Sequence, residues 1–131
     1  MSEQNEHVYF VNQLYRDFLL PTILGSDAPA ILYWAGKRIT RKYDLSDLDD
    51  LVEFFNMAEF GQLKVVKERR ASMIFSLSGQ AVSDRLASGS KEFSLESGMI
   101  AEAVEEAKQR STEAEIAVDD KKQTVTITTF F

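Results

Sequence analysis

Three short glycine-bearing segments, in a fixed order along the chain, constrain the fold more than any other feature. They cover residues 31–36 (ILYWAG), 59–65 (EFGQLKV) and 93–99 (FSLESGM). Each places a glycine beside aromatic or branched residues, where packed elements must approach closely or the chain must turn. The order predicts helices that settle tightly onto a sheet through small residues, and it contains no catalytic signature.

Helical periodicity predicts three helices in the first half of the chain. The first covers residues 8–20 and is expected to end at Pro21 and Gly25. The second covers residues 28–43, and the third begins at Ser46 in a pattern typical of a capping box.

The second half alternates between strand and helix patterns. A helix capped by Ser94 is expected over the following four turns, with Glu96 in its first turn, where the helix dipole favours an acid. A weaker pattern at Val82 and Leu86 predicts a short helix. Two hairpins are expected from strands at 63–68, 73–77, 114–118 and 124–128. The order αααββαββ predicts an α+β domain with helices on one face of a four-stranded antiparallel sheet.

Composition bounds the class of protein. A chain of 131 residues forms one domain, 1–131, in which the polar residues 1–7 are expected to be a frayed leader. The net charge of −6 argues against nucleic-acid binding, which requires clustered cations. The absence of cysteine excludes disulfides, thiolate metal sites and a cysteine nucleophile. With no signal-like start and no long apolar run, we expect a cytoplasmic protein without a membrane span.

The ordered segments resemble the 4-vinyl reductase domain and the related subunits of the transport protein particle (TRAPP). More closely, the chain is similar to the small, uncharacterised YslB-like proteins of Bacillus relatives, through residues 93–101 (FSLESGMIA) and 77–79 (LSG). The resemblance implies a fold that often dimerises through its helices and can hold an apolar ligand beside the sheet. Many 4-vinyl reductase domains carry cysteines where this chain has Phe93 and Ser94, so a thiolate metal site is not implied.

A group of aromatic and methionine side chains forms either a filled core or a ligand pocket. As a pocket, it would hold a fatty acyl chain or a tetrapyrrole between helices and sheet, with Arg38 or Lys42 facing its carboxylate. The six candidate pocket residues are Tyr33, Trp34, Phe55, Met73, Phe75 and Met99.

No residue cluster indicates a reaction mechanism. The single histidine, His7, lies in the polar leader, and the acidic stretch 44–53 lacks the ligand spacing of an EF-hand. No serine can be paired with a histidine base in an ordered region. We therefore predict no catalytic residue, no metal ligand and no cofactor.

The sequence leaves two main functional hypotheses, and an enzymatic function ranks third behind them. The first is a non-enzymatic adaptor or scaffold that forms a homodimer, because the first helix carries more apolar residues than one buried stripe requires. The second is a sensor or carrier of an apolar small molecule. The basic stretch 37–42, which includes Arg38 and Arg41, is either a solvated helix end or a docking surface for an acidic protein partner.

Overall fold

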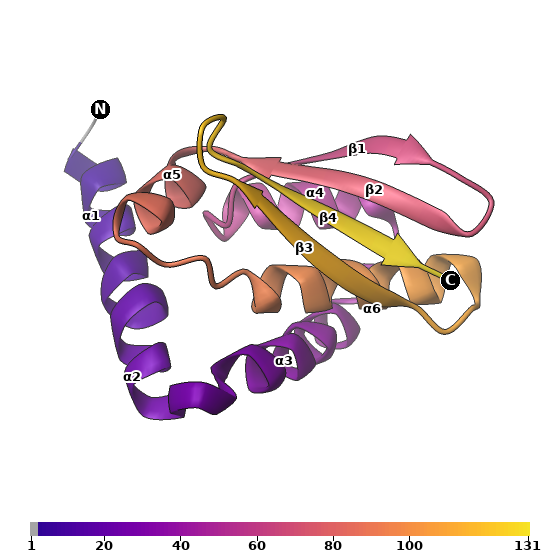
Figure 1. Ribbon diagram of the computed structural model, residues 1–131, viewed down its shortest axis with the longest axis horizontal. Coiled ribbons are helices and arrows are strands. Elements are labelled where there is room, and N and C mark those ends of the chain that lie inside the picture. The colour runs from indigo at the N-terminus through magenta and orange to yellow at the C-terminus, as the bar shows by residue number, and fades with distance from the viewer. Residues whose placement is uncertain (1–2) are drawn as a thin grey trace.

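The computed structural model describes residues 3–131, and side chains from Glu6 onward. Its elements, in chain order, are α1 (Glu3–Asn12), the π-helix η1 (Gln13–Leu19), α2 (Leu20–Leu24), the 3-10 turn η2 (Gly25–Asp27), α3 (Ala28–Tyr43), α4 (Leu48–Met57), β1 (Gln62–Glu68), β2 (Ser72–Ser78), α5 (Gln80–Ala87), α6 (Ser94–Lys108), β3 (Glu113–Asp119) and β4 (Thr124–Phe130). The predicted α+β class is confirmed, with the short helix α5 added to the main order (Figure 1).

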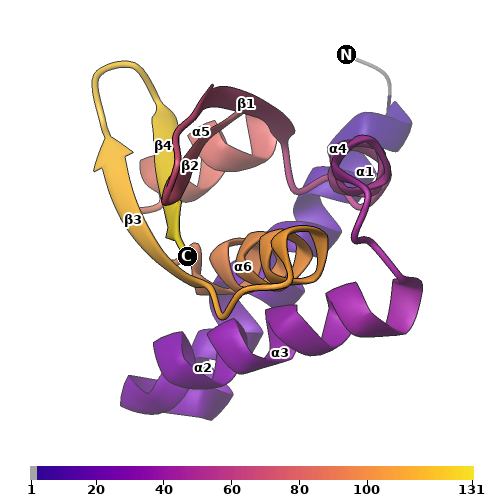
Figure 2. The ribbon, with the colours of Figure 1, turned by 90° about the vertical axis from the view of Figure 1, so that its right-hand side faces the viewer.

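The four strands form one antiparallel sheet in the order β1-β2-β4-β3. Side chains alternate between the two faces of β2 and β4, so that Phe75 and Ile127 are both buried on the inner face and are paired in register. Helices α4, α5 and α6 contact this face, and α6 lies in the hollow of the twisted sheet (Figure 2). The core is thus enclosed between the sheet and these helices.

Helix α3 packs on α6 rather than directly on the strands, and forms the outer layer of the domain (Figure 2). Two glycines bring the helices together: an added Cβ at Gly36 would lie 2.1 Å from the Leu95 carbonyl oxygen, and one at Gly98 would lie 2.1 Å from the Tyr33 carbonyl oxygen. Such distances leave no room for any other residue. Small residues thus allow close packing here between two helices, rather than between a helix and the sheet as expected.

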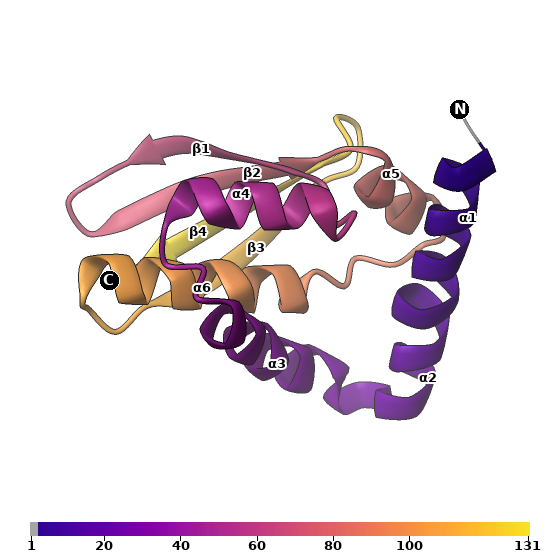
Figure 3. The same cartoon turned by 180° about the vertical axis from the view of Figure 1, so that it is seen from behind.

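The first helix runs further than predicted. The helical path continues through Pro21, and the turn comes at Gly25, where φ is +61°. Residues 13–19 open into a π-helix, in which the Leu20 amide donates to the Tyr15 carbonyl five residues back. A proline ring crowds the carbonyl four residues before it, and the wider π-turn relieves that contact. The helical column α1–η1–α2, called the arm below, stands at one end of the domain (Figure 3).

Two helix starts differ from the predictions by one position. The third helix is capped by Asp47 rather than Ser46, because the Asp47 carboxylate accepts a hydrogen bond from the Asp49 amide at 2.8 Å. Ser94 does not cap α6; its own amide donates to the Glu92 carboxylate. Of the predicted leader 1–7, Met1 and Ser2 lie outside the described residues, and α1 already begins at Glu3.

Candidate functional site

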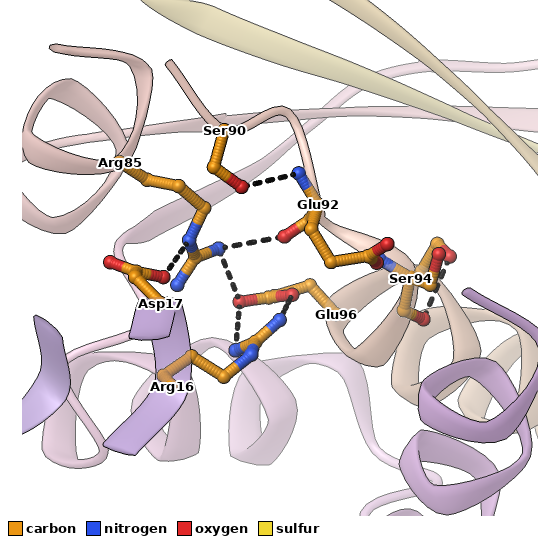
Figure 4. Close-up of polar contacts among 8 residues, drawn as sticks. Arg16, Asp17, Arg85, Ser90, Glu92, Ser94 and Glu96 are labelled. Carbon is orange, nitrogen blue, oxygen red and sulfur yellow. Dashed lines mark hydrogen bonds and ion pairs between the residues drawn. The ribbon is translucent and has the colours of Figure 1, made fainter. Parts of the chain in front are cut away.

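A buried network of four charged side chains joins the arm to the body of the domain. Arg16 donates two hydrogen bonds to Glu96, with nitrogen–oxygen distances of 2.8 and 2.6 Å. Arg85 donates to both carboxylates of the network, at 2.6 Å to that of Asp17 and at 3.2 Å to that of Glu96 (Figure 4). Glu96 is fully buried, so its carboxylate is held entirely by protein groups.

Each element of the network is positioned by local structure. The π-helix η1 carries Arg16 and Asp17 as neighbours that both face the body, while α5 supplies Arg85 and the first turn of α6 supplies Glu96. Arg85 also donates to the carbonyl oxygen of Glu92 at 3.2 Å, which ties down the loop before α6. Three segments distant in sequence are therefore joined at one point.

The electrostatics of the network favour its charged form. Burial by itself would raise the pKa of the Glu96 carboxyl, but the guanidinium groups of Arg16 and Arg85 outweigh burial and lower this pKa to about 2. Burial would lower the pKa of Arg85, yet the carboxylates of Glu96 and Asp17 raise it above its ordinary value. Glu96 and Arg85 thus stay charged near neutral pH, which suits a structural connection better than proton transfer.

The amphipathic pattern of the arm is reversed relative to an ordinary surface helix. Arg16 is buried against the body, whereas Phe10 and Phe18 on the outer side are 61% and 63% exposed. Further apolar side chains are exposed along the arm at Leu14, Tyr15 and Ile23. Because Phe10, Leu14 and Phe18 recur every four residues, they form one outward stripe, called the outer stripe below.

A groove of about 770 Å³ lies between the arm and the loop that leads to α6. Its apolar lining comes from Phe18, Pro21, Ala28 and Pro29, and its polar lining includes Asp17, Ser90 and Glu92. Since ligand pockets of proteins commonly enclose 300–1,000 Å³, its size suits a small organic molecule.

The six residues predicted to line a pocket divide into two groups. Phe55, Met73, Phe75 and Met99 lie together, buried in one apolar cluster between sheet and helices. The structure does not bring Tyr33 and Trp34 to them.

Tyr33 instead links α3 to β3. Its hydroxyl donates to the Glu113 carboxylate at 2.6 Å and accepts from the Ala114 amide at 3.1 Å. Burial and this carboxylate raise the pKa of the Tyr33 hydroxyl, and the same hydrogen bond lowers the pKa of Glu113.

Trp34 lies on the outer face of α3 and is 61% exposed. The guanidinium carbon of Arg38 lies 5.5 Å from the centre of its ring, and the Lys42 ammonium lies 5.7 Å from the ring of Tyr43. Each of the two predicted anion partners thus lies beside an exposed aromatic ring rather than beside the buried cluster.

Other candidates from the sequence occupy ordinary positions. His7 is exposed on α1, and Asp47 caps α4. Among the residues that the structure describes, no group of three or more histidine or acidic side chains is placed to hold a metal ion.

Sequence reasoning missed the buried network. Its one visible signal in the sequence was the pair Arg16-Asp17, which lies inside an otherwise apolar helical repeat. Amphipathic patterning predicts that two such charged side chains face solvent. Glu96 was predicted only as an acid favoured by the helix dipole in the first turn of its helix. In the structure its carboxylate also forms salt bridges with two guanidinium groups, those of Arg16 and Arg85.

The helical stretch Glu6–Tyr43 is long and apolar enough, by length and composition, to cross a membrane. Core helices and signal sequences satisfy the same test, so this observation is weak evidence for a span. Here the stretch turns sharply at Gly25 and includes the buried ion pair of Arg16.

Comparison with known proteins places the chain in a family. It is 36% identical over 104 residues to the uncharacterized protein YslB of Bacillus subtilis (strain 168), an alignment that covers 79% of this chain and 68% of that protein. The model of a family described as "Protein of unknown function (DUF2507)" matches residues 9–129, nearly the whole of the fold described above. The chain therefore belongs to the DUF2507 family.

Proposed function

We propose that this chain is a non-enzymatic association domain that forms a homodimer through the outer stripe of the arm and serves as an adaptor or scaffold. The observation that carries the proposal is the reversed pattern of the arm, in which Arg16 is buried while Phe10 and Phe18 face outward. Exposed aromatic side chains are costly in a monomer and are typical of protein interfaces. The resemblance to 4-vinyl reductase and TRAPP domains, which often pair through their helices, supports the same interpretation.

A second copy is the simplest partner for this stripe. A twofold interface brings the same patch of each chain together, so an apolar stripe can pack against its own symmetry mate without a complementary charge pattern. The outer stripe, extended by Tyr15 and Ile23, provides such a patch. The buried network keeps it in place, because Arg16 and Asp17 prevent the arm from turning its aromatic side inward.

Light scattering of the purified chain tests the proposal. We expect a dimer at micromolar concentration, and a monomer with unchanged far-UV circular dichroism for the Phe10→Ser/Phe18→Ser double variant. Met57→Ser/Val66→Ser, which removes equally exposed apolar groups from α4 and β1, is the matched control and should remain dimeric. A wild-type monomer, or a control that dissociates equally, would contradict the proposal.

A second candidate function is the binding of an apolar small molecule, and the groove beside Phe18 favours it. A fatty acyl chain or a tetrapyrrole could lie along Pro21, Ala28 and Pro29. Native mass spectrometry of recombinant protein, followed by thermal shift with fatty acids and porphyrins, tests this function directly. The absence of both a retained adduct and a shift in melting temperature would argue against it.

A further inference from the structure

We propose that the outer face of α3, defined by Ile31, Trp34, Arg38 and Lys42 and called the α3 face below, is a peripheral docking site for an anionic lipid surface. This inference is independent of the homodimer, which uses the arm. It concerns a surface contact and requires no segment to cross the bilayer.

The side chains of this face are aligned and exposed. Trp34, Arg38 and Lys42 follow one another at intervals of four residues, and Ile31 lies one turn before Trp34, so all four project from one side of the helix. The stacking of Arg38 on Trp34 places an aromatic ring and a cation together at the surface. Figure 2 shows α3 at the outer edge of the domain, with α6 between it and the sheet.

The charge of the face is positive and local. Between Ala28 and Tyr43 the helix contains four cations and no acidic residue, although the whole chain has a net charge of −6. Lys37 and Arg41 are already paired, with Glu113 and Glu102.

The two remaining cations of α3 make no salt bridge within the part of the chain that the structure describes. They are Arg38 and Lys42. An anionic surface would therefore attract this side of the molecule and orient it, while the rest is repelled.

The apolar part of the face favours lipid over an acidic protein. Tryptophan is enriched at membrane–water interfaces, where its ring lies at the level of the headgroups. Surface-bound helices combine Lys and Arg with Trp and aliphatic residues in this way. The outer side of a helix is convex and offers no groove in which a protein segment could bind. A layer of lipid headgroups is deformable and can adapt to a convex surface.

The fluorescence of Trp34 tests the proposal without a label, because it is the only tryptophan in the chain. Full-length protein is titrated with vesicles of phosphatidylglycerol and phosphatidylcholine, and separately with vesicles of phosphatidylcholine alone. We expect a blue shift of the emission only with the anionic vesicles, and a weaker apparent affinity at higher salt.

Two matched variants assign the binding to the α3 face. Arg38→Gln/Lys42→Gln should weaken vesicle binding about 25-fold, because each cation near an anionic surface strengthens binding roughly fivefold. Arg69→Gln/Arg70→Gln removes the same charge from the exposed turn between β1 and β2, and should leave binding unchanged. Circular dichroism confirms that both variants are folded.

Several results would overturn the proposal. They are an absence of binding to anionic vesicles, equal binding to neutral vesicles, and equal losses in the two variants. Polyglutamate is the probe for the competing partner, an acidic protein. A blue shift with polyglutamate and none with anionic vesicles would replace the lipid surface with that partner.

Discussion

Replacing Gly98 by alanine should destabilise the fold, because this position lies at the close crossing of α6 and α3. The new Cβ would lie 2.1 Å from the carbonyl oxygen of Tyr33 and 2.9 Å from its carbonyl carbon. Ordinary contact begins near 3.4 Å, so the two backbones would have to separate by about 1.3 Å. Both neighbouring atoms belong to the backbone, and neither can move aside as the end of a flexible side chain could.

The size of the effect follows from three contributions. Overpacking a tight contact costs roughly 1–3 kcal/mol, and the backbone neighbour places this case at the upper end. The separation would also break the hydrogen bond that Thr40 donates to the Met99 carbonyl at 2.9 Å, at a cost of about 1 kcal/mol. The higher helix propensity of alanine offsets about 1 kcal/mol of this loss in the free energy of unfolding. The expected loss in the free energy of unfolding is therefore roughly 3 kcal/mol.

Urea denaturation followed by circular dichroism measures this loss. The matched control is Ala107→Gly in the same helix, where the residue is exposed and glycine should be the worse choice by about 1 kcal/mol. Glycine should therefore give the more stable protein at position 98, and alanine the more stable protein at position 107. If Gly98→Ala proves as stable as the wild type, the close crossing of α3 and α6 is not as described.

Three further perturbations test the polar contacts. Arg16→Leu should lower the free energy of unfolding by roughly 3–5 kcal/mol, because it leaves Glu96 buried with half its partners, and urea denaturation measures the loss. The pKa of Glu96 is about 2 in the folded chain, below its ordinary value of 4.5, so the ionised carboxylate stabilises the fold. This stabilisation is complete above pH 4.5 and is lost as the pH falls toward 2. Glu96→Gln should therefore make the free energy of unfolding less dependent on pH between 4.5 and 2. Tyr33→Phe removes the hydrogen bond that lowers the pKa of Glu113, so the carboxyl should titrate at higher pH in an NMR titration, and an unchanged pKa would contradict that contact.

Most of the fold could be predicted because its elements carry strong periodic patterns. The sequence of β4 alternates between threonine and a branched apolar residue over residues 124–128, and Gly36 and Gly98 were visible as small residues in otherwise bulky helices. The boundaries were less predictable, since the choice between Ser46 and Asp47 as a cap depends on local geometry. Patterns fix the type of an element better than its first residue.

The candidate site was much less predictable. The partners Arg16 and Glu96 are 80 positions apart, and nothing in either local pattern indicates that they meet. The widening of η1 into a π-helix was also not predicted, because single-residue helix propensities do not describe how a proline ring crowds the carbonyl four residues before it. Composition also cannot separate a filled cluster from an open pocket, because both require the same apolar residues.

The buried network and the exposed aromatic side chains of the arm are two consequences of one arrangement. A helix with Arg16 and Asp17 on one side and Phe10, Leu14 and Phe18 on the other would ordinarily bury its aromatic side. It cannot do so here, because Arg85 and Glu96 on the body would lose their partners, and leaving a buried charge unpaired costs several kcal/mol. The ion network therefore determines which side of the arm faces solvent. The exposed side of the arm therefore carries Phe10 and Phe18, and the apolar area of these rings contributes little to the hydrophobic stability of the described chain.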